Sequence, residues 1–204
     1  MESIVFRILK FEELGKLEEE IDKLGDLAER EARSKLIEDI IDKIGEYDLH
    51  IRKYEYEKYM EKLLNRGIEF IPLERTEIVS MWDDTFNCLV EEQKKSKMKN
   101  YNNQFRWHLF SFELLHAKCK ADAKAAFDSQ NKNILYLFHD DSQEAYLIKN
   151  AHLLNAADID VLNELCGLGQ ADIYLFDSEE KWTYIKTHEG ELGPYYFCAK
   201  KIDM

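Results

Sequence analysis

The residues of this chain that could do chemistry gather in its last third, where His188 and Glu189 follow a strand-like run. A histidine and a glutamate at the end of a strand can act as a general base and its orienting group, or as two metal ligands. The same side chains can instead hydrogen-bond the Gly190–Pro194 turn and hold the next strand in register. Both interpretations stay open, and the structural one is the simpler.

Four residues around this pair are the candidate binding residues. Side chains alternate along a strand, so Trp182 and Tyr184 share one face and Thr187 belongs to the other. Tyr195 comes just after the Gly-Pro turn. In the alternative interpretation, Trp182 and Tyr184 bury their rings in the core.

A second histidine, His139, is followed by Asp140 and Asp141 at the end of another strand-like run. If the two runs are neighbours in one sheet, these residues and His188 would have the ligand types of a divalent metal site. Aspartates are also common in turns, because they satisfy backbone amides there. We therefore expect no metal site. If there is one, its ligands would be His139, Asp140, Asp141 and His188.

Common catalytic and cofactor motifs are missing from the sequence, which has no GxSxG, P-loop, GxGxxG or HExxH pattern. Its 8 glycines leave little material for loops that bind phosphate. The cysteines are widely spaced, without the close pairs of a zinc site. We therefore expect no cofactor, and four reduced cysteines: Cys88, Cys119, Cys166 and Cys198.

The formal net charge of −13 limits the partners that the chain can take. Residues 132–204 alone carry 6 basic and 13 acidic side chains. Nucleic acid and anionic membrane surfaces both require concentrated positive charge, so neither is expected as a partner. A basic protein partner would suit this charge. We find no apolar run long enough to span a membrane and no signal-peptide pattern, which favours the cytoplasm.

Residues 12–66 are predicted to be helical, because they lack proline and are rich in Glu, Lys, Leu and Ile. Two heptad seams, Leu14–Leu24 and Ile37–Tyr54, are out of phase with each other. Gly25 before Asp26 favours a break, so we expect a helical hairpin or one long helix with a stutter. This arm, residues 1–66, would pack on its own α+β domain, residues 67–204, or form a homodimer through its helices.

The α+β domain is predicted from the order of its turns and apolar runs. Residues 133–151 and 172–189 read as two hairpins, with a helix at 156–166 between them and a last edge strand after Gly193-Pro194. A helix is expected from Thr76 to about Lys95, and residues 105–115 fit either a bulged strand or a helical turn. Helices gathered on one face of an antiparallel sheet make an α+β fold.

Three blocks of this domain resemble a known family: "FRWHLFSFE" with "AKAAFDSQ", "ILYLFHDD" with "AYLIKNAHLLNAADI", and "DIYLFDSEEKWTYIKTHEGELGPYYF". The third block carries the family's most specific elements, at Trp182–Tyr184, Thr187–Glu189 and Gly193–Tyr195. The chain resembles the bacterial domain of unknown function 4275 over residues 68–197. The resemblance implies a fold and no reaction.

The sequence favours a non-catalytic binding protein over an enzyme. An acidic sheet domain with no catalytic motif fits an intracellular bacterial protein of immunity or antitoxin type, which would occlude a basic partner. The alternative is a hydrolase-type or metal-dependent enzyme that uses His188 and Glu189.

Overall fold

The computed structural model describes residues 13–90, 105–140, 142–166 and 171–199. The chain forms two compact units, residues 1–51 and residues 52–204. The boundary predicted at residues 66 and 67 stays a prediction.

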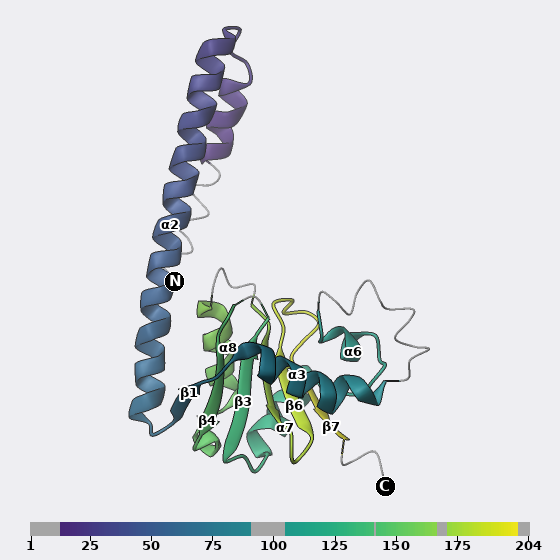
Figure 1. Ribbon diagram of the computed structural model, residues 1–204. Helices are drawn as coiled ribbons and strands as arrows, with labels where there is room; N and C mark the ends of the chain where they lie inside the picture. Colours follow the sequence, from purple (N-terminus) through teal and green to yellow (C-terminus); the bar gives the residue numbers. More distant parts are fainter. Residues whose placement is uncertain (1–12, 91–104, 141, 167–170, 200–204) are drawn as a thin grey trace. The chain divides into compact units, whose positions relative to one another are not determined.

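The first unit is a helical hairpin (Figure 1). Helical residues 13–21 return along the first part of α2 (Leu27–Asn65), which runs without a break through the region between the two predicted seams. Asp26 Oδ1 accepts a hydrogen bond of 2.9 Å from Ala28 N, so Asp26 caps α2. Leu14, Ile21 and Ile37 form the small buried core of this unit.

The second unit contains a seven-stranded sheet in the order β1-β4-β3-β5-β6-β7-β2, in which all neighbours are antiparallel. Both predicted hairpins form, as β3/β4 and β5/β6. The last predicted strand, β7, is not an edge, because β2 pairs with its outer side. The strands are β1 (Glu69–Pro72), β2 (Lys118–Cys119), β3 (Ile134–His139), β4 (Ala145–Lys149), β5 (Ile173–Asp177), β6 (Trp182–Lys186) and β7 (Tyr195–Cys198).

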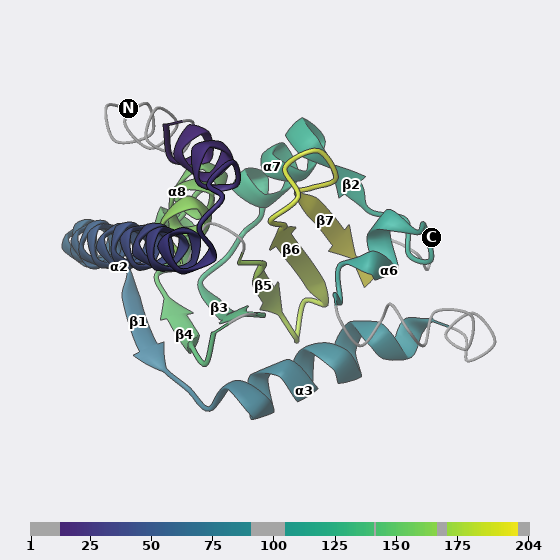
Figure 2. The same ribbon diagram turned by 90° about the horizontal axis from the view of Figure 1, so that it is seen from above.

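Helices cover both faces of this sheet (Figure 2). The expectation that they gather on one face was wrong, because central strands such as β5 are buried on both sides. The fold class, α+β, is confirmed. Helices α3 and α6 lie on one face, and α7 and α8 lie on the other. The helices of this unit after α2 are α3 (Arg75–Phe86), η1 (Asn87–Leu89), α6 (His108–Ser111), α7 (Lys120–Ser129), η2 (Ala151–Leu153) and α8 (Ala156–Leu165).

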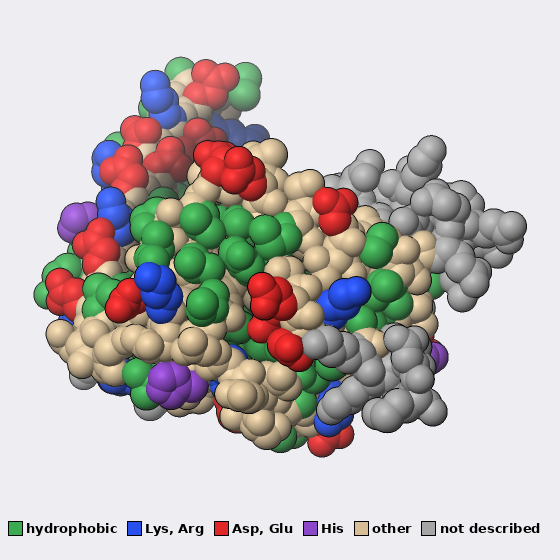
Figure 3. Space-filling view, turned by 60° about the horizontal axis from the view of Figure 1, so that its bottom comes forward, with side chains coloured by type: hydrophobic (Ala, Val, Ile, Leu, Met, Phe, Trp, Pro, Cys, Tyr) green, Lys and Arg blue, Asp and Glu red, His purple; other side chains and the backbone are tan. Residues whose placement is uncertain are grey.

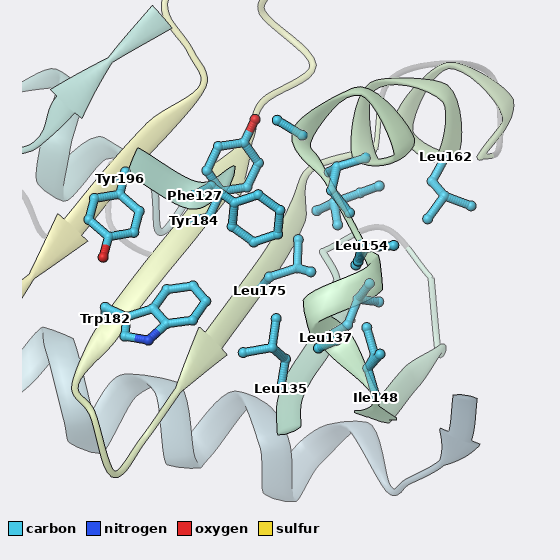
Figure 4. Close-up of a cluster of buried hydrophobic side chains, with 14 of the residues drawn as sticks. Phe127, Leu135, Leu137, Ile148, Leu154, Leu162, Leu175, Trp182, Tyr184 and Tyr196 are labelled. Carbon is cyan, nitrogen blue, oxygen red and sulfur yellow. The ribbon is translucent and has the colours of Figure 1, made fainter. Parts of the chain in front are cut away.

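The core on the α7 and α8 face is built from aliphatic and aromatic side chains (Figure 4). The rings of Phe127 and Tyr184 stack with centroids 4.5 Å apart, and Trp182 lies edge-on to Phe127. The C-terminal part of α2 contributes Leu63, which is fully buried. This part of α2 therefore belongs to the sheet unit.

The ends of several helices can be compared with the residues that begin and end them. Gly67, just after α2, has φ 94°, a left-handed conformation that glycine adopts readily at a helix end. Helix α3 begins at Arg75 and ends at Phe86, so Thr76 is not its N-cap, and residues 91–95 lie outside the described part. Residues 108–111 form a helical turn. Within the described residues, no helix is long and apolar enough to cross a membrane.

Candidate functional site

The two hairpins share one rim of the sheet. His139 at the end of β3 pairs with Ile173 at the start of β5, and Ile173 pairs with Lys186 at the end of β6. Just beyond the pairing, Asp140 N donates a hydrogen bond of 3.1 Å to the carbonyl oxygen of Asp172. The strand ends that carry the predicted site residues are therefore neighbours.

His188 is held at this rim by a residue that the sequence did not single out, Asp172. The Nδ1 atom of His188 lies 2.9 Å from Asp172 Oδ1, and the backbone N–H of His188 donates to the same oxygen at 2.7 Å. An imidazole that donates from Nδ1 to a carboxylate keeps Nε2 as a proton acceptor. His188 is thus oriented as a general base would be, with its side chain 22% exposed.

Asp172 lies in a buried polar cluster. Its second oxygen, Oδ2, accepts a hydrogen bond of 2.9 Å from Trp107 Nε1. Burial raises the pKa of the Asp172 carboxyl, against the hydrogen bonds from His188 and Trp107, which favour its ionised form. Tyr174 extends the cluster, because its hydroxyl oxygen accepts a hydrogen bond of 3.2 Å from the backbone N–H of Trp107. These bonds tie the segment before α6 to the sheet.

Aromatic rings surround the imidazole of His188 on the α6 face. The ring centroids of Phe105 and Trp107 lie 5.2 Å and 6.1 Å from that of His188. The ring of His108 is tilted against that of Trp107, with centroids 4.2 Å apart, and its Nδ1 atom lies 3.1 Å from Ser111 Oγ. Burial lowers the pKa of His108. The rim therefore presents one oriented imidazole in an apolar setting.

Glu189 stands outside this arrangement. Its Oε1 atom is 3.8 Å from Nε2 of His188, beyond hydrogen-bond distance, and its side chain is 47% exposed. The role of orienting group that the sequence suggested for Glu189 is filled by Asp172 in this geometry.

His139 and His188 face opposite sides of the sheet. His139 is buried against Cys166 at the end of α8, with its Nδ1 atom 3.2 Å from the sulfur. His188 instead packs with Phe105 on the α6 side. Burial, with Arg75 nearby, lowers the pKa of His139 to about 4, so the imidazole is neutral. The two histidines do not converge on one site.

Asp140 belongs to a network of ion pairs rather than to either histidine. Its Oδ1 atom lies 3.0 Å from Arg106 Nη1 and 3.5 Å from Arg75 Nη2. Arg106 in turn pairs with Asp83 of α3. Burial raises the pKa of Asp140, and the two arginines oppose that shift. Asp141 lies outside the described residues, and in the part described no group of three or more His, Cys, Asp or Glu is placed to hold a metal ion.

The four predicted binding residues are buried. Trp182 and Tyr184 are in the core on the α7 and α8 face, both with no exposed surface. Thr187 donates to the carbonyl oxygen of Glu189 at 2.9 Å and packs where a side chain at Gly193 would sit. Tyr195 stacks on Trp107 at 6.4 Å, behind the rim. A binding role for these four residues stays a prediction.

Comparison with known protein families identifies the family of the chain. The model of a domain of unknown function, DUF4275, matches residues 57–196, more than half of the chain. The chain belongs to this family. The resemblance seen in the sequence is confirmed, and the matched DUF4275 domain begins in α2, before the predicted start at Ile68. No curated protein and no solved structure matches.

Asp172 and Trp107 were missed because their partners are distant in the sequence. Asp172 is separated from Trp107 by 65 positions and from His188 by 16. A polar residue directly before the fully buried run of β5 was the one signal that could have marked Asp172. Trp107 lies in the segment of residues 105–115, which the sequence assigned to a bulged strand or a helical turn, and it is fully buried.

Proposed function

We propose that the DUF4275 domain is a non-catalytic binding protein of immunity or antitoxin type, whose partner is a basic protein. The partner would be held at an apolar face of the sheet with acidic neighbours. Such a surface combines apolar contact with electrostatic steering toward positive charge. A cytoplasmic location fits this proposal.

The observation that carries the proposal is a partly exposed row of apolar side chains across three strands. Ile71 of β1 is opposite Leu147 of β4, which is opposite Tyr136 of β3. Ile134, two residues before Tyr136 and on the same face, is 46% exposed. These four residues, Ile71, Ile134, Tyr136 and Leu147, are called the sheet strip. Figure 3 shows hydrophobic side chains gathered on this face beside acidic ones.

The charge around the sheet strip suits a basic partner. Ile134, Tyr136 and Leu147 line a groove of about 430 Å³ that Asp177 and Glu179 also line. At the outer edge Glu69 and Lys149 lie 3.9 Å apart and offset each other's charge. The field at the groove is therefore negative, as a segment with apolar side chains between lysines or arginines would require.

Affinity capture tests this proposal, with the tagged protein as bait in lysate of the organism that encodes it. We expect the wild-type protein to retain one basic protein in stoichiometric amount at moderate salt. Ile134→Lys and Glu179→Lys should each reduce its recovery about tenfold, because each places a lysine against a basic partner. A tenfold weaker affinity corresponds to about 1.4 kcal/mol of binding free energy.

Matched controls for the capture lie away from the sheet strip. Leu153 is 38% exposed and Glu164 is exposed on α8, so Leu153→Lys and Glu164→Lys introduce the same charge elsewhere. Both controls should retain the partner like the wild type. An empty capture, or equal recovery by all five proteins, would refute the proposal.

A hydrolase is the second candidate, and the Asp172–His188 pair is the observation that favours it. In this reading Nε2 of His188 takes a proton from a water molecule that attacks a carbonyl or phosphoryl centre, while Asp172 positions the ring and stabilises the imidazolium. Glu189 would lie beside the same nitrogen, as a base partner or as a ligand in a metal-dependent variant.

Hydrolysis of a panel of nitrophenyl esters and phosphates tests the second candidate. If it is right, His188→Gln should lower the rate on a turned-over substrate by about 100-fold, the usual contribution of a general base. Glu191→Gln, an exposed change in the following turn, is the control. No turnover on any member of the panel, with and without added divalent metal, would count against the enzyme.

A further inference from the structure

The groove at the sheet strip brings apolar surface and carboxylates together. Its volume is about 430 Å³, within the usual range of ligand sites. Ile134 and Leu147 line it from β3 and β4, whereas Asp177 and Glu179 line it from the turn between β5 and β6. Because β3 lies between β4 and β5, an occupant of the groove meets both kinds of surface over β3. This groove is called the strip groove.

The polar side of the strip groove holds acceptors that are not yet used. Asp177 accepts the backbone N–H groups of Glu179 and Glu180 through one oxygen, Oδ1, at 2.9 Å and 2.8 Å. Among the residues that the structure describes, Asp177 Oδ2 and the carboxylate of Glu179 have no hydrogen bond or ion pair. Asn131 and Asn133 also line the strip groove, and their side-chain amides are equally free within the same described residues. An occupant should therefore bring positive charge and several N–H donors.

An aromatic ring forms the middle of the strip groove. Tyr136 packs on Phe176 with ring centroids 5.2 Å apart, and it also lines the groove. The ring surface that faces the groove is the part that Phe176 leaves uncovered. A cation over such a ring is attracted by the negative face of the π-system, and an apolar stem beside it is favoured by Ile134 and Leu147.

Arginine meets these requirements better than lysine does. A guanidinium is planar and weakly hydrated, so it stacks on aromatic rings, and its five N–H donors form a fixed fork that matches carboxylates. A lysine ammonium is a compact and strongly hydrated point charge. A groove with a ring and free acceptors side by side therefore favours the planar group, which can contact both at once.

We infer that the strip groove is a recognition site for one arginine side chain of the basic partner. The methylene stem of this arginine lies along Ile134 and Leu147, and its guanidinium lies against the ring of Tyr136. The N–H groups donate to Glu179 and to the free oxygen of Asp177. This inference rests on the proposed function and names the side chain that the sheet strip recognises.

An NMR titration of the isotope-labelled full chain with short peptides tests the inference. Acetyl-Leu-Arg-Leu-amide and acetyl-Leu-Lys-Leu-amide carry the same charge, so they differ only in the shape and hydration of the cation. The arginine peptide should bind at least about fivefold more tightly, and should shift the backbone amide signals of β3 and of the turn after β5. A citrulline peptide, which has the shape of arginine without its charge, should cause no shift. Equal dissociation constants for arginine and lysine, or no shift with either, would overturn the inference.

Two variants locate the site of binding. Tyr136→Leu should bring the ratio of the two dissociation constants to about one, because it removes the ring and keeps the charges. Glu179→Gln, a change at an exposed turn position, should weaken the arginine peptide at least about fivefold. Glu164→Gln, at an exposed position of α8, is the matched control and should leave both dissociation constants unchanged. Full arginine preference in Tyr136→Leu, or unchanged arginine affinity in Glu179→Gln, would overturn the inference.

Failure of the proposed function is seen in a different experiment. An empty affinity capture would refute the basic partner itself. A partner captured through Ile134 and Glu179, together with peptides that show no preference for arginine, would overturn arginine recognition alone.

Discussion

Asp172 accepts three hydrogen bonds from two separate segments, which ties the chain at Trp107 to the end of β6. Removal of the carboxylate would leave buried donors of Trp107 and His188 without partners. An unpaired buried donor costs about 1–3 kcal/mol. We expect Asp172→Ala to lower the free energy of unfolding by about 3 kcal/mol or more, measured by urea denaturation.

His188→Ala separates the structural role from the chemical one. This variant keeps the backbone hydrogen bond to Asp172 and the bond from Trp107, so it should lose only about 1 kcal/mol. A loss as large as that of Asp172→Ala would mean that the imidazole itself holds the rim together, and would remove the basis for a catalytic His188.

His139 gives the molecule a pH dependence whose sign follows from its lowered pKa. The imidazole titrates at about 4 in the folded chain and at 6.5 when unperturbed. Its contribution to stability is therefore complete above pH 6.5 and is lost as the pH falls toward 4. Between pH 7.5 and pH 4.5 the wild type should lose about 2 kcal/mol more than His139→Gln.

Urea denaturation of both proteins at the two pH values measures this difference. The variant serves as the reference because the buried carboxyls Asp140 and Asp172, whose pKa values are raised, titrate in both proteins. Equal losses in wild type and His139→Gln would contradict the assignment of a neutral buried imidazole.

At the scale of elements, α8 is fixed by Asp158 in its first turn. Asp158 accepts the N–H of Asn155 in a reciprocal capping box and binds Arg66 through both oxygens, at 2.6 Å and 3.0 Å. Burial would raise its pKa, but the hydrogen bonds from Arg66 and Asn155 hold the pKa below its ordinary value. Asp158 therefore joins α8 to the end of α2.

Loss of Asp158 should therefore loosen α8. We expect Asp158→Ala to lower the thermal midpoint and to cost about 3 kcal/mol, because it leaves Arg66 without its carboxylate partner and removes the Asp158 half of the capping box. Glu164→Ala, an exposed change in the same helix, should stay within about 0.5 kcal/mol of the wild type. Similar values for the two variants would refute the role of the network.

The elements that the sequence predicted well are those with local signals. The β3/β4 and β5/β6 hairpins follow from alternation and turn residues. The break before α2 follows from Gly25 and Asp26, and Asp26 caps that helix. β2 lacks such a signal, since it is short and pairs with a strand far along the chain. The partner of His188 was missed for the same reason, because Asp172 meets it only in the folded sheet.

At the scale of the whole molecule, the charge is the property that composition does predict. The net charge of −13 follows from counting, but the sheet strip does not. Alternation marks Ile134 and Tyr136 as apolar, while their exposure depends on which part of the sheet the helices leave open. The surface on which the proposed function rests is therefore a property of the fold.

Photo-crosslinking in living cells tests that surface most directly. A photoreactive residue replaces Tyr136 in the sheet strip, or Leu192, an exposed apolar residue in the turn before β7, as the control. The account predicts that one basic protein is trapped from position 136 and not from position 192. No trapped protein at position 136, or the same protein trapped equally from both positions, would contradict it.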